Sequence, residues 1–402
     1  MKVNFKKTGF KKVIVAALAA VIGLASCTTD AIVDNMNNGG SSSGVYSDSK
    51  SVTLKVASKL PTTRSEGSSI AAQETVKFNN GWLLFVSAQN NVTKVMEIKT
   101  GTSTMNDSEV DISLLIQSGG VEIENVPGHS TSVYVIGNLP AGGGITVPAV
   151  GVSLTNLKQN LIAFSTQDDI HNVTLFGGDA IKIENTKNVA RFSLSPIVAR
   201  IEIAKISSTG GSSDISSFKV EGIFINNYYE NITLEGNAPA VAKKNTDIAD
   251  FAGNSTAYPD TYEGILYDYR SAAGQSLGVP HATEANTYTP TTGAWAYNLL
   301  APKTGTPPDM LTAPHIIIAV SDIQTNSGTE YNGIWYLTVK NMVHQNNKIT
   351  HLEPGKVYSI KNINFSHTNI QPEPEMKTID VDVEVTLVEW EIIDTDVIFG
   401  QD

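Results

Sequence analysis

Apolar and polar residues alternate in short runs along most of the chain. In SVTLKV (Ser51–Val56), Val52, Leu54 and Val56 alternate with polar residues, which is the period of a half-buried strand. WLLFVSA (Trp82–Ala88) is apolar almost throughout, as expected for a strand buried on both faces. No amphipathic helical pattern of comparable strength occurs. The pattern therefore predicts an all-β protein.

A second series of strand patterns begins near Ala190. In RFSLSPIVARIEIAKI, alternate residues from Ile197 to Ile203 share one face, and Arg200 and Glu202 lie on the other. Residues 231–292 are rich in Asn, Ala, Thr, Pro and Asp, and we expect surface loops there. These series predict two antiparallel β-sandwiches in tandem. The predicted domains are 65–188 and 189–402.

The N-terminus has the pattern of an export signal. Five lysines precede a run of about a dozen apolar residues, Val13–Leu24, which is short of the about 20 needed to span a bilayer. The run leads to Leu24-Ala25-Ser26-Cys27, which resembles a bacterial lipobox. Cys27 is the only cysteine, so an intramolecular disulfide is excluded. We expect 1–27 to be a lipoprotein signal peptide with lipid on Cys27; the alternative is an ordinary signal peptide with an incidental cysteine.

Residues 28–64 are expected to be a tether followed by a removable strand. Asn, Gly and Ser dominate 28–50, and little apolar surface is available there to offset the entropy of ordering. The strand with Val52, Leu54 and Val56 follows, and then a polar linker that contains Arg64. An apolar strand is thus joined to the rest of the chain by a segment with a single arginine.

The charge of the chain argues against a nucleic-acid partner. The net charge is −12, from 28 Lys and Arg against 40 Asp and Glu. Residues 1–64 hold nine basic and three acidic residues, so the remainder has 28 − 9 = 19 against 40 − 3 = 37, or −18. Contacts to phosphates need clustered Lys and Arg. The acidic remainder favours solubility at a cell surface.

The sequence contains no motif that indicates an enzyme, a cofactor or a metal site. The seven histidines are scattered and do not form HExxH or another compact ligand spacing. The adjoining carboxylates Asp168 and Asp169 would point to opposite faces of a strand, and we expect them to be solvated loop charges. The four tryptophans lie within apolar strand patterns and are expected to pack in cores.

Several segments taken together resemble the fimbrillins, the pilin subunits of the type V pili of Bacteroidales. They are the lipobox, the Asn/Gly/Ser tether, the strand before Arg64, SVYVIGNLP, VARIEIAKI, VEGIFINNYY, LEPGKVYSIKNINF and VDVEVTLVEWEI. The resemblance extends over essentially the whole chain, and it implies that the two β-sandwiches are of the transthyretin-like, Greek-key kind. It implies an outer-membrane lipoprotein precursor that an arginine-specific protease cleaves, releasing the first strand. The open groove then accepts a C-terminal strand of a neighbouring subunit.

Carried over to this chain, the resemblance implies cleavage between Arg64 and Ser65. The other arginines are poorer candidates: Arg191 and Arg200 lie in strand patterns that a protease cannot enter. A cut after Arg270, in LYDYRSAAG, would split the second domain instead of freeing a strand.

The C-terminal region offers two candidate donor strands. In residues 379–388, apolar residues from Ile379 to Leu387 alternate with polar ones. After Leu387 the apolar residues move to the other set of alternate positions, and a bulge near Leu387 would explain this shift. We favour the final stretch as the donor, with 379–388 completing the second domain; the reverse assignment stays open. The favoured donor residues are Trp390, Ile392, Val397 and Phe399.

The sequence therefore predicts a structural shaft subunit of a cell-surface fimbria that supports adhesion and biofilm formation. Its expected partners are further copies of itself, tip and anchor fimbrial subunits, the arginine-specific protease and, transiently, the lipid of the outer membrane. The alternative is a surface lipoprotein that binds glycan or host protein and never polymerises. Such a protein would keep Cys27 and its lipid, whereas the mature pilin would begin at Ser65.

Overall fold

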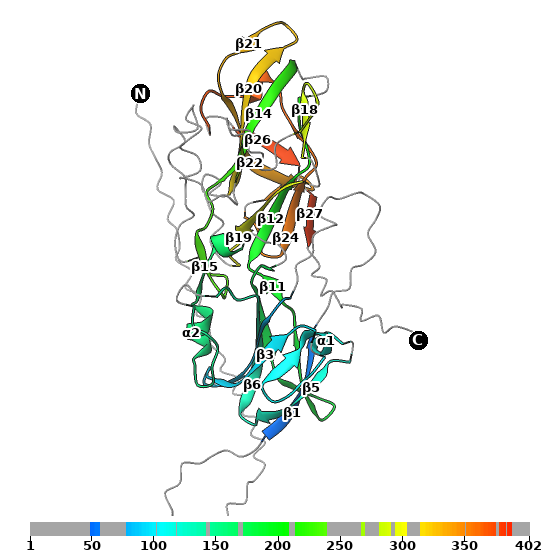
Figure 1. Ribbon diagram of the computed structural model, residues 1–402, viewed down its shortest axis with the longest axis vertical. Coiled ribbons are helices and arrows are strands. Elements are labelled where there is room, and N and C mark those ends of the chain that lie inside the picture. Colours follow the sequence, from blue (N-terminus) through cyan, green and yellow to red (C-terminus); the bar gives the residue numbers. More distant parts are fainter. Residues whose placement is uncertain are drawn as a thin grey trace, which may run out of the picture. The chain divides into compact units, whose positions relative to one another are not determined.

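The computed structural model describes most of the chain between Ser49 and Leu387, all within one compact unit, Tyr46–Asp402 (Figure 1). The described part consists of strands and a few short helices, so the fold is all-β, as predicted. None of its helices has the length and apolar character needed to cross a membrane. The described residues are 49–56, 78–101, 103–117, 119–141, 145–167, 172–208, 214–238, 267–269, 281–290, 294–303, 314–349, 351–374, 378–382 and 384–387.

Apart from β7 (Leu161–Ala163), the strands up to residue 196 form two sheets, which we call the first group. One has four strands in the order β5-β1-β10-β9, and the other has six in the order β11-β8-β6-β2-β3-β4. Most neighbours are antiparallel, but β1 with β10 and β3 with β4 are parallel. The strands are β1 (Ser49–Val56), β2 (Gly81–Ser87), β3 (Val92–Lys99), β4 (Glu109–Asp111), β5 (Val121–Pro127), β6 (Ser130–Gly137), β8 (Leu175–Ala180), β9 (Lys182–Glu184), β10 (Lys187–Phe192) and β11 (Ser195–Pro196).

Apart from β15 (Asn231–Thr233), the strands from residue 198 onward form three further sheets, which we call the second group. Two have four strands, in the orders β19-β12-β24-β27 and β17-β18-β13-β25. The third has the order β16-β14-β20-β22-β23, with β21 beside β20 and β26 beside β22. The first strands are β12 (Val198–Ile203), β13 (Ile206–Ser207), β14 (Ile215–Asn226), β16 (Tyr267–Tyr269), β17 (His281–Glu284), β18 (Thr287–Thr289) and β19 (Trp295–Leu300). The others are β20 (His315–Thr325), β21 (Glu330–Tyr331), β22 (Trp335–His344), β23 (Asn347–Lys348), β24 (Lys356–Ile360), β25 (Ile363–Asn364), β26 (Thr378–Asp382) and β27 (Glu384–Leu387).

A small two-stranded sheet pairs β7 (Leu161–Ala163) of the earlier part of the chain with β15 (Asn231–Thr233) of the later part. The helices are short: α1 (Ile112–Leu115), α2 (Leu154–Lys158) and the 3-10 turns η2 (Phe164–Thr166) and η5 (His367–Asn369). In α1 the Asp111 side chain caps the helix by accepting a bond from the Ser113 amide. The stretch EVDISLLI, which fits a strand or a helix, is thus a strand that turns into one helical turn.

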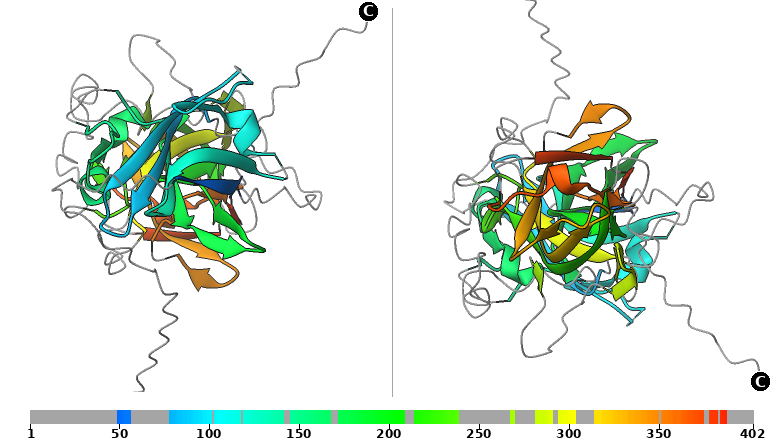
Figure 2. Two further views of the ribbon diagram at one scale, coloured as in Figure 1. Left: turned by 90° about the horizontal axis from the view of Figure 1, so that it is seen from below. Right: turned by 90° about the horizontal axis from the view of Figure 1, so that it is seen from above.

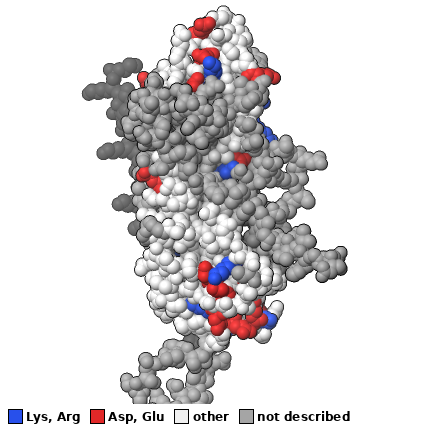
Figure 3. Space-filling view, in the orientation of Figure 1, with Lys and Arg blue, Asp and Glu red and all other residues white. Residues whose placement is uncertain are grey.

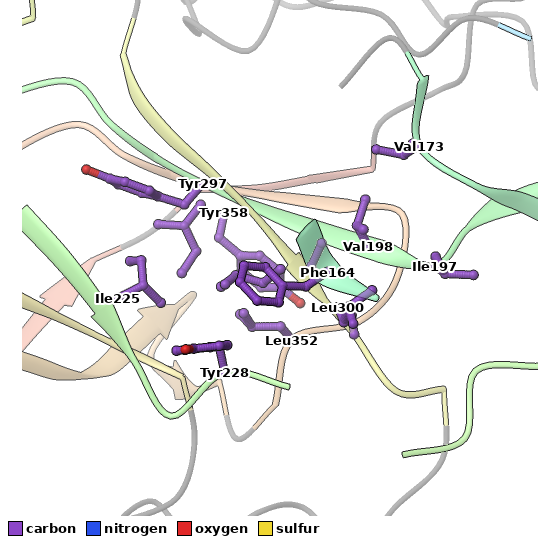
Figure 4. Close-up of a cluster of buried hydrophobic side chains, with 14 of the residues drawn as sticks. Phe164, Val173, Ile197, Val198, Ile225, Tyr228, Tyr297, Leu300, Leu352 and Tyr358 are labelled. Atoms are coloured by element: carbon purple, nitrogen blue, oxygen red, sulfur yellow. The ribbon is translucent and has the colours of Figure 1, made fainter. Parts of the chain in front are cut away.

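A continuous apolar cluster contains residues of both groups. Figure 4 shows part of it, where Phe164 and Val173 lie with residues from later in the chain such as Tyr228. The Phe164 and Tyr228 rings are tilted, with their centroids 5.1 Å apart. The continuous run of β2 also follows the prediction, since Leu83 and Leu84 point to opposite faces and are both buried.

The region 231–292 differs from the surface loops expected there, because β15, β16, β17 and β18 fall within it. In β18 the buried side chain of Tyr288 packs against Phe218, with the ring centroids 5.2 Å apart. The Tyr288 hydroxyl donates to the Phe218 carbonyl over 2.9 Å. Three residues with one buried aromatic are too few to show an alternating pattern, which is why the sequence did not reveal this strand.

The expected boundary between residues 188 and 189 falls inside β10, which pairs with β1 and β9 of the first group. The strands of the first group continue to β11, and β12 begins the second group two residues later. The sequence pattern that starts near Ala190 therefore includes strands of both groups.

Candidate functional site

β1, drawn in dark blue in Figures 1 and 2, lies between β5 and β10. We call this position the β1 slot. β1 runs antiparallel to β5 and parallel to β10. Val52, Thr53 and Leu54 are paired on both sides, whereas Ser49 and Lys50 pair with β5 alone. The strand is therefore held from both sides at its centre and from one side towards each end.

The side chains of β1 alternate between the core and its margin, as the sequence predicts. Val52 and Leu54 are 0% exposed. They belong to the same apolar cluster as Ile123 of β5 and Phe192 of β10. Burial of each such side chain contributes about 1.5–3 kcal/mol. A chain without β1 would expose this apolar groove, together with unpaired backbone groups on two neighbouring strands.

Lys50 anchors the beginning of β1. Its Nζ donates to the Ser130 carbonyl of β6 over 2.5 Å. Burial lowers the pKa of the Lys50 ammonium below its ordinary value, because the charged form loses hydration. The lysine thus links β1 to the opposite sheet through one hydrogen bond while its charge is partly desolvated.

Asn188 of β10 makes a second side-chain contact to β1. Its Nδ2 donates to the Ser51 carbonyl over 3.1 Å. The bond satisfies a backbone acceptor just before the doubly paired centre of the strand. Such a bond contributes about 0.5–1.5 kcal/mol.

Seven of the predicted site residues lie outside the described residues. They are Cys27, Arg64, Ser65, Trp390, Ile392, Val397 and Phe399. Lipidation, cleavage and the identity of the donor strand therefore stay predictions. The predicted strand residues Val52, Leu54 and Val56 all lie in β1, and Val56 is paired with Phe192.

Two of the other arginines lie in strands. Arg191 is part of β10, where it pairs with Lys55, and its guanidinium binds Glu184 at 2.7 Å. Arg200 is part of β12, and its Nε is 2.7 Å from a Glu202 carboxylate oxygen. A protease must bind an extended, unpaired backbone, so these two positions are poor cleavage sites in the folded chain. Arg270 lies outside the described residues.

The first candidate donor segment is paired within the chain. β26 runs parallel to β22, and β27 runs antiparallel to β24. The chain therefore moves from one sheet to another between Asp382 and Glu384. The bulge expected near Leu387 falls at the end of the described residues, since Val388 lies outside them.

Charged side chains do not form a large basic surface on the face drawn in Figure 3, where the blue and red side chains of the described residues lie beside one another in small groups. Lys99 with Glu109, at 2.6 Å, and Lys158 with Glu235, at 2.9 Å, are pairs of this kind. Within the described ranges, no three His, Cys, Asp or Glu side chains converge in a way that could hold a metal ion.

Sequence reasoning did not identify Lys50 or Asn188 as residues of the β1 slot, nor Gly120, which directly precedes Val121, the β5 partner of Leu54. Lys50 and Asn188 act through contacts to residues far away in the chain, which no local pattern reveals. The pair Gly119-Gly120 before VEIENV carried a usable signal, because two glycines before a strand pattern indicate a tight turn.

No protein-family model matches the chain, and a search of curated proteins found no match. Solved structures do resemble it. A fimbrilin from Porphyromonas gingivalis is 13% identical with a TM-score of 0.49, and the match covers 84% of this chain and 97% of that one. A candidate cell adhesion protein from Bacteroides eggerthii is 15% identical with a TM-score of 0.46, and the match covers 86% of this chain and 96% of that one.

A tip fimbrial protein from Porphyromonas gingivalis is also similar. It is 8% identical with a TM-score of 0.39, and the match covers 84% of this chain and 99% of that one. These three solved structures are thus a fimbrilin, a candidate cell adhesion protein and a tip fimbrial protein. At these identities the likeness concerns the fold alone.

Proposed function

We propose that this chain is a structural subunit of a cell-surface fimbria and polymerises by strand exchange. It is exported as an outer-membrane lipoprotein through Cys27 and is cleaved between Arg64 and Ser65. Cleavage releases β1, and a C-terminal strand of another copy, with Trp390, Ile392, Val397 and Phe399, enters the β1 slot. The resulting fimbria supports adhesion and biofilm formation.

The observation that carries this proposal is the position of β1. It is an interior strand of its sheet, with Val52 and Leu54 fully buried, yet the sequence connects it to the next described residue, Phe78, through a segment that contains Arg64. One cut after Arg64 would separate β1 from all the other strands. The groove left behind would need a replacement strand, because it exposes apolar side chains and two unpaired edges.

The pairing of β26 and β27 supports the choice of the final stretch as the donor. Both strands already have partners within the chain, so a donor from 378–387 would have to leave two sheets. We therefore propose the stretch after Leu387 as the donor. Tip and anchor subunits, proteins of the same architecture at the ends of the polymer, are the expected further partners.

The experiment that tests the proposal is cleavage of the purified full chain by an arginine-specific protease. We expect a new N-terminus at Ser65 by mass spectrometry and a ladder of oligomers on gels run without boiling. A complete cut at Arg64 that leaves only monomers would contradict strand exchange.

Arg64→Lys is the matched control variant. It keeps the positive charge and the length of the linker but removes the arginine that the protease recognises. We expect this variant to remain full-length and monomeric. Formation of the same oligomers by uncut Arg64→Lys would show that cleavage does not trigger polymerisation. If the unsubstituted protein stays monomeric and keeps Cys27, the alternative of a lipoprotein that binds glycan or host protein is favoured.

A further inference from the structure

Gly120 lies against the backbone of β1. It belongs to the turn between α1 and β5, where its amide donates to the Gln117 carbonyl over 2.8 Å. Its φ angle is +76°, a conformation that residues with a side chain rarely adopt. The next residue, Val121, begins β5 and is paired with Leu54. Gly120 therefore stands at the end of the doubly paired centre of the β1 slot.

A side chain at this position would collide with β1. A Cβ atom on Gly120 would lie 2.2 Å from the Leu54 carbonyl oxygen and 2.8 Å from the Lys55 Cγ. The lysine side chain can rotate away, but the Leu54 carbonyl is part of a backbone paired with β5 and β10. Any residue other than glycine would therefore have to push the strand itself out of its place.

The same collision applies to any strand that fills the slot in the direction and register of β1. Strands in a sheet lie about 4.7–4.9 Å apart, so a strand that pairs with both β5 and β10 has to follow the path of β1. The group that meets Gly120 is a backbone group, which every residue has. The requirement for glycine is thus independent of the sequence of the occupant.

We propose that Gly120 determines how closely a strand can be held in the β1 slot, and that it acts on two occupants in turn. Before cleavage the occupant is β1. After cleavage it is the C-terminal strand of a second copy of this chain, and this second half of the inference rests on the proposed function. Substitution of Gly120 weakens the retention of β1 and the capture of the incoming strand alike.

The chain offers two matched controls for Gly120→Ala. Gly101 has the same φ angle of +76°, but nothing lies within 4 Å of the position of its Cβ. Gly101→Ala therefore reproduces the backbone strain without the collision. Gly119 also has open space around the position of its Cβ, and its φ lies outside the left-handed region. Gly119→Ala therefore changes the residue next to Gly120 without backbone strain and without a collision with β1.

Hydrogen–deuterium exchange of the uncut full chain tests the first half. In Gly120→Ala we expect the amides of β1 to exchange at least about tenfold faster than in Gly101→Ala, since every 1.4 kcal/mol of local stability is a factor of ten. Amides of β12 should exchange equally in the two variants. Equal exchange of β1 in Gly120→Ala and Gly101→Ala would overturn the inference.

Polymer formation after arginine-specific cleavage tests the second half. We expect Gly120→Ala to give at most about a tenth of the polymer that Gly101→Ala and Gly119→Ala give, by the same factor of ten. If Gly120→Ala polymerises as well as the controls, its action on the incoming strand is refuted. If even the unsubstituted chain fails to polymerise while the exchange result holds, the proposed function fails and the action of Gly120 on β1 stands.

Gly120→Asn covers the case in which Gly120→Ala does not fold. Asparagine tolerates the left-handed conformation better than alanine but still carries a Cβ atom. With Gly101→Asn as its control, the same faster exchange in β1 is expected, and its absence would again overturn the inference.

Discussion

β1 and β12 hold equivalent positions in two sheets of the molecule. In the order β5-β1-β10-β9, β1 is antiparallel to one neighbour and parallel to the other; in the order β19-β12-β24-β27, so is β12. Each has fully buried side chains, such as Leu54 in β1 and Ile201 in β12. The packing gives no reason why one strand should be removable and the other permanent.

The two strands differ in how the chain enters and leaves them. β12 follows β11 after one residue and leads to β13 after two, so short connections join it to other strands at both ends. β1 is the first described strand, and one linker with Arg64 connects it to everything that follows. The two strands therefore differ in connectivity and not in burial, and under the proposed cleavage after Arg64 only β1 would be separated from the other strands.

The largest effect is expected from deletion of residues 390–402. The uncut chain should keep both β1 and β12 in place, because the deleted residues follow both strands and the last described strand, β27. After cleavage we expect the loss of β1 without a replacement, and therefore no polymer on gels run without boiling. Polymers of normal length would move the donor to 379–388.

An effect of intermediate size is expected from shortening the two buried side chains. Leu54→Ala and Ile201→Ala should each destabilise the uncut chain by about 2–5 kcal/mol, because both leave a cavity in the core. After cleavage and release of β1, the effect of Leu54→Ala should vanish and that of Ile201→Ala should persist. Urea unfolding before and after cleavage measures this difference, and a lasting effect of Leu54→Ala would mean that β1 stays bound.

The smallest effect concerns the charge on Lys50, which is partly desolvated in β1. Burial lowers the pKa of Lys50 in the folded chain, so in the pH range just below its ordinary value of 10.5 the unfolded chain binds more protons. The contribution of Lys50 to stability therefore increases as the pH rises through this range.

Lys50→Met, which keeps most of the length of the side chain, removes this titration. Relative to Lys50→Met, the free energy of unfolding of the unsubstituted uncut chain should rise by a fraction of a kcal/mol as the pH approaches 10.5. The rise is small because the Lys50 side chain is partly exposed to solvent. Unfolding by urea at several pH values measures the difference between the two chains. If the difference in unfolding free energy between the two chains falls as the pH rises, the lowered pKa of Lys50 is contradicted. If the pH-dependent rise disappears after release of β1, it belongs to β1 and not to strands such as β12.

The sequence predicted β1 and β2 well, because both depend on which face of a strand is buried. Alternation placed Val52 and Leu54 in the core, and the continuous run in β2 indicated burial on both faces. The period of a strand does not say which strand lies beside it. The parallel partner β10 comes much later in the chain, and residues as distant as Ser51 and Asn188 meet there.

The same limit explains what sequence reasoning missed at the site. The collision that excludes a Cβ atom at Gly120 depends on the carbonyl of Leu54, and the anchor of Lys50 depends on Ser130. Both contacts arise only when the strands assemble. Connectivity, in contrast, is written in the sequence, and it was sufficient to suggest which strand is removable.

The central claim is that β1 leaves its slot and is replaced. Mass spectrometry of purified polymer, dissociated under denaturing conditions, tests this directly. The account predicts chains that begin at Ser65 and no fragment that ends at Arg64. A fragment that contains β1, present once for every chain in the polymer, would show that β1 remains in its slot and would contradict strand exchange.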